Sequence, residues 1–203
     1  MTEPDHYFTA QPASADERRV LRVRLAGQGI EVETAGGVFS PDHVDTGTRV
    51  LLDHAPPPPA AGDLLDLGCG WGPIALTLAL TSPDARVWAV DVNERALDLV
   101  RRNAERAGAT NLTALRPDEV PADVRFAAIW SNPPIRVGKA ALHELLRSWL
   151  PRLDAGARAQ LVISKNLGAD SLQRWLADEL GPDLVVERTA NAKGFRVLTV
   201  SSP

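Results

Sequence analysis

Short apolar segments alternate with longer amphipathic segments over most of the chain, and this alternation restricts the fold more than any other feature of the sequence. The short segments predict strands, at Leu64–Leu67, Arg86–Val90, Leu112–Leu115, Phe126–Trp130, Gln160–Ser164, Leu184–Glu187 and Phe195–Val200. The longer segments predict helices, at Ile74–Leu80, Glu94–Ala107, Lys139–Leu150 and Ala169–Leu180. Nearly all-apolar strands that alternate with helices indicate an α/β fold, with a mostly parallel sheet and helices on both faces. The connection between the last two strands is too short for a helical crossover, so we expect one antiparallel strand.

The first 55 residues predict an arm outside this sheet. Val20–Leu25 and Ile30–Thr34 alternate in polarity and predict a β-hairpin with its turn at Gly27–Gly29. Apolar residues at helical spacing predict a helix at Val44–His54. The four prolines Pro56–Pro59 can neither continue a helix nor join a central strand, so they indicate a stiff connector. We therefore expect an arm at 1–55, a connector at 56–62 and a main domain at 63–203.

The composition excludes several classes of protein. The chain has 203 residues, 44% of them hydrophobic, which is enough for one globular domain with its own core. The single cysteine, Cys69, excludes a disulfide framework and a multi-cysteine zinc site, and the four histidines lack the spacing of metal ligands. There is no apolar run of about 18 residues to span a membrane, and the N-terminal residues do not resemble a secretory signal. We expect a cytoplasmic protein that binds neither membrane nor metal.

The charge is unevenly distributed. The formal net charge is −4, which argues against a protein that coats nucleic acid non-specifically. Residues 1–110 carry 16 acidic and 10 basic side chains, whereas residues 111–203 carry 10 acidic and 12 basic ones. A basic cluster in the arm is either a solvated hairpin face or a contact with nucleic acid, and it consists of Arg18, Arg19, Arg22 and Arg24.

A glycine-rich turn provides the strongest functional signal. In the segment LLDLGCGWGPIAL, residues 64–76, Gly68, Gly70 and Gly72 follow a predicted strand and precede a predicted helix. Open α/β sheets bind ligands at the carboxyl ends of their strands, and glycines let the backbone approach the ligand. Asp66, two residues before the first glycine, suits a cationic group such as the ammonium of an amino acid. The alternative is that Asp66 only caps the following helix.

Two further strand ends carry polar residues. Asp91 closes the next predicted strand, where a carboxylate can accept both hydroxyls of a ribose. The alternative for Asp91 is a helix cap, a role that fits Asn93 better. Asn132, Pro133 and Pro134 follow another apolar strand. Prolines donate no backbone hydrogen bond and leave carbonyls free to accept, so this turn can hold an exocyclic NH2 group.

These motifs resemble a known family. DLGCGWG and Asp91 are similar to the cofactor motifs of the class I S-adenosylmethionine-dependent methyltransferases, whose sheet is Rossmann-like. Asn132 to Ile135 resemble the motif N-P-P followed by Tyr, Phe or Ile in enzymes that methylate a planar amino nitrogen. With HYFTAQP (6–12), GVFSPDHVDTGTRVLL (37–52) and KGFRVLTV (193–200), the chain resembles the small-subunit ribosomal RNA guanine-N2-methyltransferases, especially their single-domain relatives.

The resemblance implies roles for individual residues. The cofactor S-adenosylmethionine would be held by Asp66, Gly68, Cys69, Gly70, Asp91, Val92, Asp118, Asn132 and Thr48. Asp91 would bind the ribose, and Val92 and Asp118 the adenine. Thr48, with Gly47, is equally consistent with the start of a helix capped by Asp45.

The catalytic residues would be Asn132, Pro133 and Pro134, with Ile135, Arg136 and Phe195 in contact with the substrate. Many relatives carry an aromatic residue at position 135, which Phe195 or Tyr7 could replace. The resemblance implies methyl transfer to guanine N2 in ribosomal RNA. N-methylation of a small molecule or a protein amide, or a non-catalytic module that binds cofactor or RNA, remains as an alternative.

Overall fold

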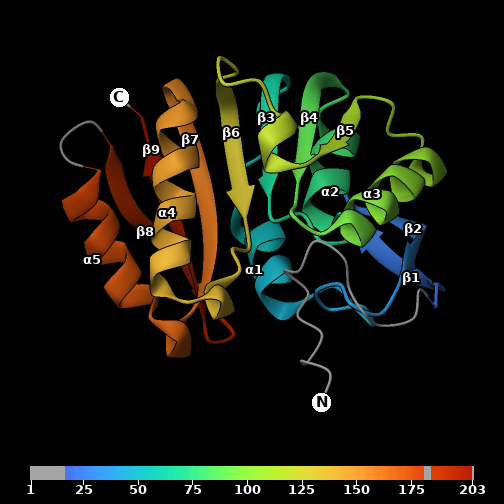
Figure 1. Cartoon of the computed structure of the whole chain (residues 1–203), viewed down its shortest axis with the longest axis horizontal. Helices are drawn as coiled ribbons and strands as arrows, with labels where there is room; N and C mark the ends of the chain where they lie inside the picture. The colour runs from blue at the N-terminus through green and yellow to red at the C-terminus, as the bar shows by residue number, and fades with distance from the viewer. Residues whose placement is uncertain (1–16, 181–183, 203) are drawn as a thin grey trace.

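A seven-stranded sheet runs through the computed structural model, which describes residues 17–180 and 184–202 (Figure 1). The strand order is β5-β4-β3-β6-β7-β9-β8. The strands are β3 (Ala61–Leu67), β4 (Asp84–Val90), β5 (Leu112–Leu115), β6 (Phe126–Ser131), β7 (Leu153–Ser164), β8 (Val185–Ala192) and β9 (Phe195–Ser201). β9 is antiparallel to both of its neighbours, and all other neighbouring strands pair in parallel. The predicted mostly parallel sheet with one antiparallel strand is confirmed.

Helices cover both faces of this sheet, as predicted. The helices are α1 (Thr46–His54), α2 (Pro73–Thr81), α3 (Glu94–Ala107), α4 (Lys139–Trp149) and α5 (Ala169–Glu179), with short 3-10 turns at Pro117–Glu119, Ile135–Val137, Leu150–Arg152 and Lys165–Leu167. Successive residues of a strand point to opposite faces. Leu64 accordingly packs under α1, α2 and α3, whereas Leu65 packs under α4 and α5. No helix in the described part of the chain is long and apolar enough to cross a membrane.

The N-terminal hairpin consists of β1 (Arg19–Leu25) and β2 (Gln28–Thr34). Its turn was predicted one residue too late, because Ala26 and Gly27 form it and Gly29 lies inside β2. Both turn residues have positive φ, 48° and 76°. This is the geometry of a two-residue type I′ turn, whose twist matches that of the paired strands.

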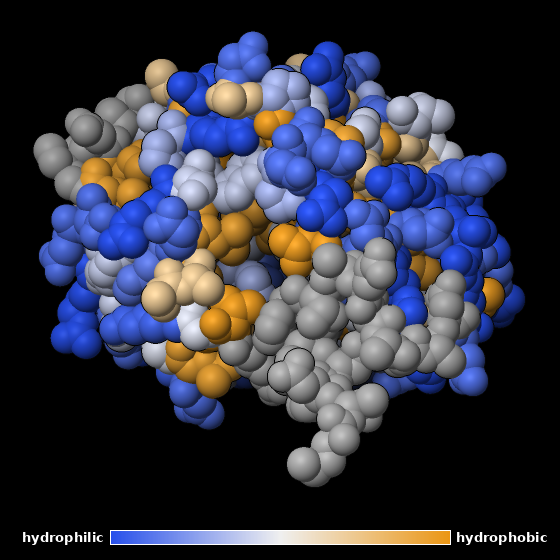
Figure 2. Space-filling view, viewed as in Figure 1, coloured by the Kyte–Doolittle hydropathy of each residue, from blue (hydrophilic) through white to orange (hydrophobic). Residues whose placement is uncertain are grey.

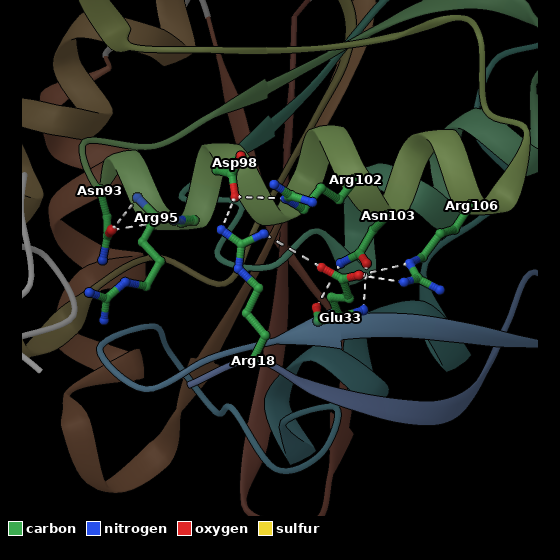
Figure 3. Close-up of polar contacts among 9 residues, drawn as sticks. Arg18, Glu33, Asn93, Arg95, Asp98, Arg102, Asn103 and Arg106 are labelled. Carbon is green, nitrogen blue, oxygen red and sulfur yellow. Dashed lines mark hydrogen bonds and ion pairs between the residues drawn. The ribbon is translucent and has the colours of Figure 1, made fainter. Parts of the chain in front are cut away.

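The hairpin packs against α3 through a polar contact that we call the hairpin seam (Figure 3). Asn103 Oδ1 accepts a hydrogen bond from the Glu33 backbone N–H at 2.6 Å, and its Nδ2 donates to the carbonyls of Glu33 and Trp71 at 2.9 and 3.0 Å. The Glu33 carboxylate pairs with Arg106, and Arg18 pairs with Asp98 at 2.9 Å. The seam joins the hairpin to the main domain through these polar contacts, although Glu33 Oε2 is buried without a hydrogen bond and lies 3.8 Å from Arg18.

Several boundaries differ from the prediction. α1 begins at Thr46 rather than Val44 because Asp45 caps it. β7 begins at Leu153, seven residues before the predicted strand, and β8 extends to Ala192 rather than Glu187. Both extensions contain exposed polar residues, so they show no continuous apolar run. The division into arm, connector and main domain remains a prediction; β3 begins at Ala61, inside the expected connector.

Candidate active site

A cavity lies at the carboxyl ends of β3, β4 and β6 (Figure 2). Figure 2 shows a hollow on this face with apolar residues around it. The loops after the three strands line this main cavity with Gly68, Gly70, Asp91, Val92, Asn132, Pro133 and Pro134. A smaller adjoining cavity shares Gly68, Gly70 and Asn132 and adds Thr48 and Cys69. The fold thus brings together nine of the predicted site residues.

The glycine loop is built so that its backbone borders the cavity. Gly68 N–H donates to the Val90 carbonyl at 2.8 Å, and Gly70 N–H donates to Asp91 Oδ2 at 2.9 Å. Gly70 has a φ of 54°, a conformation that other residues rarely adopt, and a Cβ there would project into open space. The loop therefore forms a cradle of backbone atoms, and its side chains leave room for a ligand to approach them.

Asp66 lies beneath this loop and is fully buried. Its Oδ2 accepts a hydrogen bond from Ala75 N–H in the first turn of α2, at 2.8 Å, so the predicted capping contact is present. Its Oδ1 is buried without a hydrogen-bond partner among the described residues. Burial, and then the charge of Asp91, raise the pKa of Asp66 to about 8, against the lowering effect of the Ala75 hydrogen bond. Asp66 itself does not line either cavity.

Asp91 faces the main cavity from the end of β4. Besides Gly70, it accepts a hydrogen bond from Asn93 N–H, on Oδ1 at 3.0 Å. Burial raises its pKa, and the backbone hydrogen bonds oppose this shift. The cap of α3 is Asn93, whose side chain accepts from Arg95 and Ala96. The alternative of Asp91 as the helix cap is therefore wrong, and its carboxylate has more acceptor sites than the backbone N–H groups that bond to it, so it can still accept from a ligand.

Asn132 is oriented by two residues from the start of α1. Its Nδ2 donates to Asp45 Oδ2 at 3.0 Å and to Thr48 Oγ1 at 3.1 Å. Asp45 Oδ2 also accepts from the backbone N–H groups of Gly47 and Thr48, at 2.8 and 3.3 Å. A carboxylate only accepts hydrogen bonds, so the nitrogen of the amide must face Asp45. Oδ1 is turned away from it, and no donor among the described residues reaches Oδ1.

The proline turn differs in one respect from the prediction. The Pro133 carbonyl is not free, because it accepts a hydrogen bond from Ile135 N–H at 2.8 Å. Pro134, with φ −74° and ψ 75°, forms an inverse γ-turn that brings these groups together. One lone pair of the Pro133 carbonyl remains. Ser131 Oγ donates to the Leu67 carbonyl at 2.6 Å and so joins the ends of β6 and β3.

Other predicted residues lie elsewhere. Asp118 does not line the cavity; its side chain is 76% exposed and pairs with Arg116 at 3.3 Å, while Pro117 lines the wall. Ile135 packs against the apolar cluster of α4 and α5. Phe195 packs on Gly47, where a Cβ would lie 2.8 Å from its ring. The side chain of Arg136, like Tyr7, lies outside the described residues.

Two residues of this site were not recognised from the sequence. The sequence pattern indicates only a helix cap at Asp45, whereas in the structure Asp45 also contacts Asn132, 87 positions away. Phe39 lines both cavities and is 36% exposed. Its only signal was its place in the segment GVFSPDHVDTG. Among residues 17–180 and 184–202 no cluster of three His, Cys, Asp or Glu side chains could hold a metal ion.

Comparisons with known proteins agree on the class of the chain. Residues 29–199 match the family named methyltransferase small domain. The uncharacterized protein YbxB of Bacillus subtilis is 34% identical over 197 residues, which cover 96% of each chain. Ribosomal RNA small subunit methyltransferase C of Pseudomonas fluorescens is 33% identical, over 85% of this chain and 51% of that protein.

A solved structure gives the same result. The 16S rRNA guanine-N2 methyltransferase of T. thermophilus, in complex with AdoMet and guanosine, superposes with a TM-score of 0.79 and 25% identity. The match covers 95% of this chain and 52% of that chain. This chain therefore spans about half the length of these two ribosomal RNA methyltransferases, but nearly all of YbxB.

Proposed function

The chain belongs to the methyltransferase small domain family, and from this premise we propose that it transfers a methyl group from S-adenosylmethionine to the N2 amino group of a guanine in ribosomal RNA. The observation that carries the proposal is the orientation of Asn132. Its amide nitrogen is held by Asp45 and Thr48, so its oxygen is left to accept a hydrogen from a substrate amino group. The named activities of the ribosomal RNA relatives support the choice of substrate.

The residues around the main cavity fit the cofactor. The buried, unpartnered Oδ1 of Asp66 is suited to an ammonium, directly or through a water molecule. The glycine cradle leaves room for the body of the cofactor, and Asp91 and Val92 line the wall where the ribose and adenine would bind. When bound, the cofactor supplies a methyl group on a positively charged sulfur, which is activated toward nucleophiles. Asp118 would contact the adenine only if its exposed side chain moved to the cavity.

Asn132 would orient the acceptor nitrogen and stabilise the positive charge that develops on it. Its Oδ1 accepts one N–H of the amino group, and the remaining lone pair of the Pro133 carbonyl can accept the other. These two acceptors leave the nitrogen lone pair free. No catalytic base is needed, because the nitrogen can lose its proton to water after the transfer.

Phe39 supports a planar substrate. Its aromatic ring lines both cavities beside Asn132, whereas Ile135 packs into the core under α4. A ring at this place can contact the face of a base, as the aromatic residue at position 135 does in many relatives. Phe39 would therefore take over that role, which the sequence had suggested for Phe195 or Tyr7.

Labelled cofactor tests the proposed reaction. The protein is incubated with methyl-labelled S-adenosylmethionine and, separately, with ribosomal RNA, free nucleosides and a protein extract. We expect label in RNA and its recovery as N2-methylguanosine after digestion. If label appears only in protein or in small molecules, RNA is not the substrate and one of the alternative substrates is supported. Calorimetry with the cofactor alone completes the test, since absence of binding would leave only the non-catalytic alternative.

A further inference from the structure

A second, larger depression runs beside α1, between this helix, α2 and the hairpin, and we call it the α1 groove. It is lined by Leu21 to Gly27 of the hairpin, by Arg49, Leu52 and Asp53 of α1, by Thr77 and Thr81 of α2, and by Lys193. Its volume is about 830 Å³, compared with about 100 Å³ for the main cavity. This volume leaves room for a segment of a polymer as well as for a small ligand, and nothing in the reaction described above uses the groove.

The α1 groove carries an excess of positive charge. Four cations line it, Arg22, Arg24, Arg49 and Lys193, together with the two acids Asp42 and Asp53. Arg22 bonds to Glu31 and Asp42 bonds to Arg19, each at 2.8 Å.

The other charged groups on the wall are unpaired. Arg24, Arg49 and Lys193 are exposed and form no side-chain hydrogen bond or ion pair with the described residues, and the same holds for Asp53. Three unpaired cations thus face one unpaired acid, in a chain whose net charge is −4. This local surplus matches a polyanion.

The groove begins beside the active site. Its lining residues Asp42, His43 and Val44 immediately precede Asp45, which orients Asn132. At the same end, Lys193 lies two positions before Phe195, whose ring packs on Gly47. Arg49 lies on α1, one position after Thr48. A strand that delivers a base to Asn132 would therefore continue into the groove.

We propose that the α1 groove binds the sugar–phosphate backbone of the RNA substrate, with Arg24, Arg49 and Lys193 contacting its phosphates. This inference rests on the proposed function, because it takes RNA as the substrate. It answers the question left by the arginine cluster of the arm: Arg24 contacts nucleic acid, whereas Arg18, Arg19 and Arg22 form ion pairs within the protein. Backbone contacts position the strand and leave the choice of base to the cavity.

The test compares two triple variants of the full chain. In the first, Arg24→Gln, Arg49→Gln and Lys193→Gln are combined. In the matched control, Arg125→Gln, Arg174→Gln and Arg188→Gln remove the same charge from exposed positions outside the groove. Urea unfolding of both variants verifies that they are folded, which we expect because none of the three groove side chains makes a hydrogen bond with the described residues.

Binding to a fluorescent single-stranded fragment of ribosomal RNA is measured at several salt concentrations, without turnover. The plot of log K against log salt has a negative slope, and each lost phosphate contact makes this slope less steep by about 0.7. For the groove variant we expect the magnitude of the slope to be smaller by about 2, and the affinity to be at least about 10-fold weaker at low salt. The control should bind within about 2-fold of the wild type.

Three results would overturn the groove as the RNA site: an unchanged slope in the groove variant, an equal loss in the control, or no RNA binding by the wild type. Cofactor calorimetry and the methylation assay report separately on the proposed function. If the wild type methylates RNA while the groove variant binds RNA normally, the groove proposal fails and the proposed function stands. A groove variant with raised KM for RNA and unchanged cofactor affinity would support the proposal.

Discussion

Two asparagines of this molecule, Asn103 in the hairpin seam and Asn132 in the active site, are used in opposite ways. In Asn103 the oxygen and the nitrogen are both bonded to backbone groups of neighbouring elements. In Asn132 the nitrogen is bonded to Asp45 and Thr48, and the oxygen meets no donor among the described residues. An unused acceptor costs stability where it is buried, whereas an acceptor that borders a cavity can be used by a ligand. An asparagine whose oxygen and nitrogen are both hydrogen-bonded within the protein thus indicates a structural role. An asparagine at a cavity with only one of the two hydrogen-bonded indicates a binding role.

The carboxylates of the two regions differ in whether a cation lies beside them. Glu33 in the seam pairs with Arg106 (Figure 3). Asp66 beneath the glycine loop has no cation beside it in the described part of the chain, and the charge of Asp91 adds to the burial that raises its pKa. The seam is therefore arranged for folding, whereas the active site keeps a carboxyl group whose charged form would be stabilised by a cationic ligand.

The largest effect is expected for Asn132→Ala, which removes the unpaired acceptor of the active site. Removal of the acceptor should lower kcat by roughly 10²- to 10³-fold, the usual effect of losing one group that stabilises a transition state. The free energy of unfolding and the cofactor affinity should change little, because the lost hydrogen bonds are at the rim of a cavity. Steady-state kinetics measures kcat, urea unfolding measures the free energy of unfolding, and calorimetry measures the cofactor affinity. Normal turnover would remove Asn132 from the mechanism.

The matched substitution in the seam is Asn103→Ala. It leaves the Glu33 N–H and the carbonyls of Glu33 and Trp71 without partners in a buried place, which should cost about 2–4 kcal/mol of stability. The kcat of the folded enzyme should stay near that of the wild type. Urea unfolding, together with kinetics at low temperature, separates the two effects. A large loss of kcat without loss of stability would contradict the structural role.

The pH dependence of stability should reveal Asp66. Its pKa of about 8 in the folded chain lies above the ordinary value of 3.8. Between these values the folded chain holds a proton that the unfolded chain releases, so stability falls as pH rises, by roughly 1 kcal/mol per pH unit. Asp66→Asn should lack this decline and keep the hydrogen bond from Ala75. Unfolding curves from pH 5 to 8 test this, and parallel profiles for the two proteins would refute it.

A smaller effect is expected for Asp45→Ser. Serine caps a helix as well as aspartate does, but its side chain is too short to reach Asn132. We expect kcat to fall about 10-fold, or about 1.4 kcal/mol, with little change in stability or cofactor affinity. Asp45→Asn keeps an oxygen that can accept the same hydrogen bonds and should restore most of the activity. If serine and asparagine are equally active, Asp45 serves only as a cap.

How far sequence alone could predict the molecule depended on how local the cause was. α3 was predicted to the residue because both of its ends carry local signals: the side chain of Asn93 caps the start, and Gly108, with φ of 67°, ends it. The start of β7 was missed because Leu153 pairs with Phe126 before a register shift, followed by exposed polar residues. The turn of the first hairpin was misplaced because three neighbouring small residues offered competing positions.

The site divides in the same way. The glycine loop and Asp91 lie within one strand–helix–strand unit, and their approach to one another follows from the parallel pairing of β3 and β4. The contact of Asp45 with Asn132 joins residues 87 positions apart, and no local sequence pattern predicts it. The direction of Ile135 depends on where α4 packs, which the N-P-P motif does not specify.

The glycine loop also contains the chain's single cysteine. Cys69 is buried, and burial together with the charges of Asp91 and Asp66 raises its pKa well above that of an ordinary thiol. The thiol therefore stays protonated, and a thiol reagent can reach it only when the loop opens. The rate at which a thiol reagent modifies Cys69 therefore reports how often the glycine loop opens, without any engineered label. A molecule that closes the cradle would lower this rate.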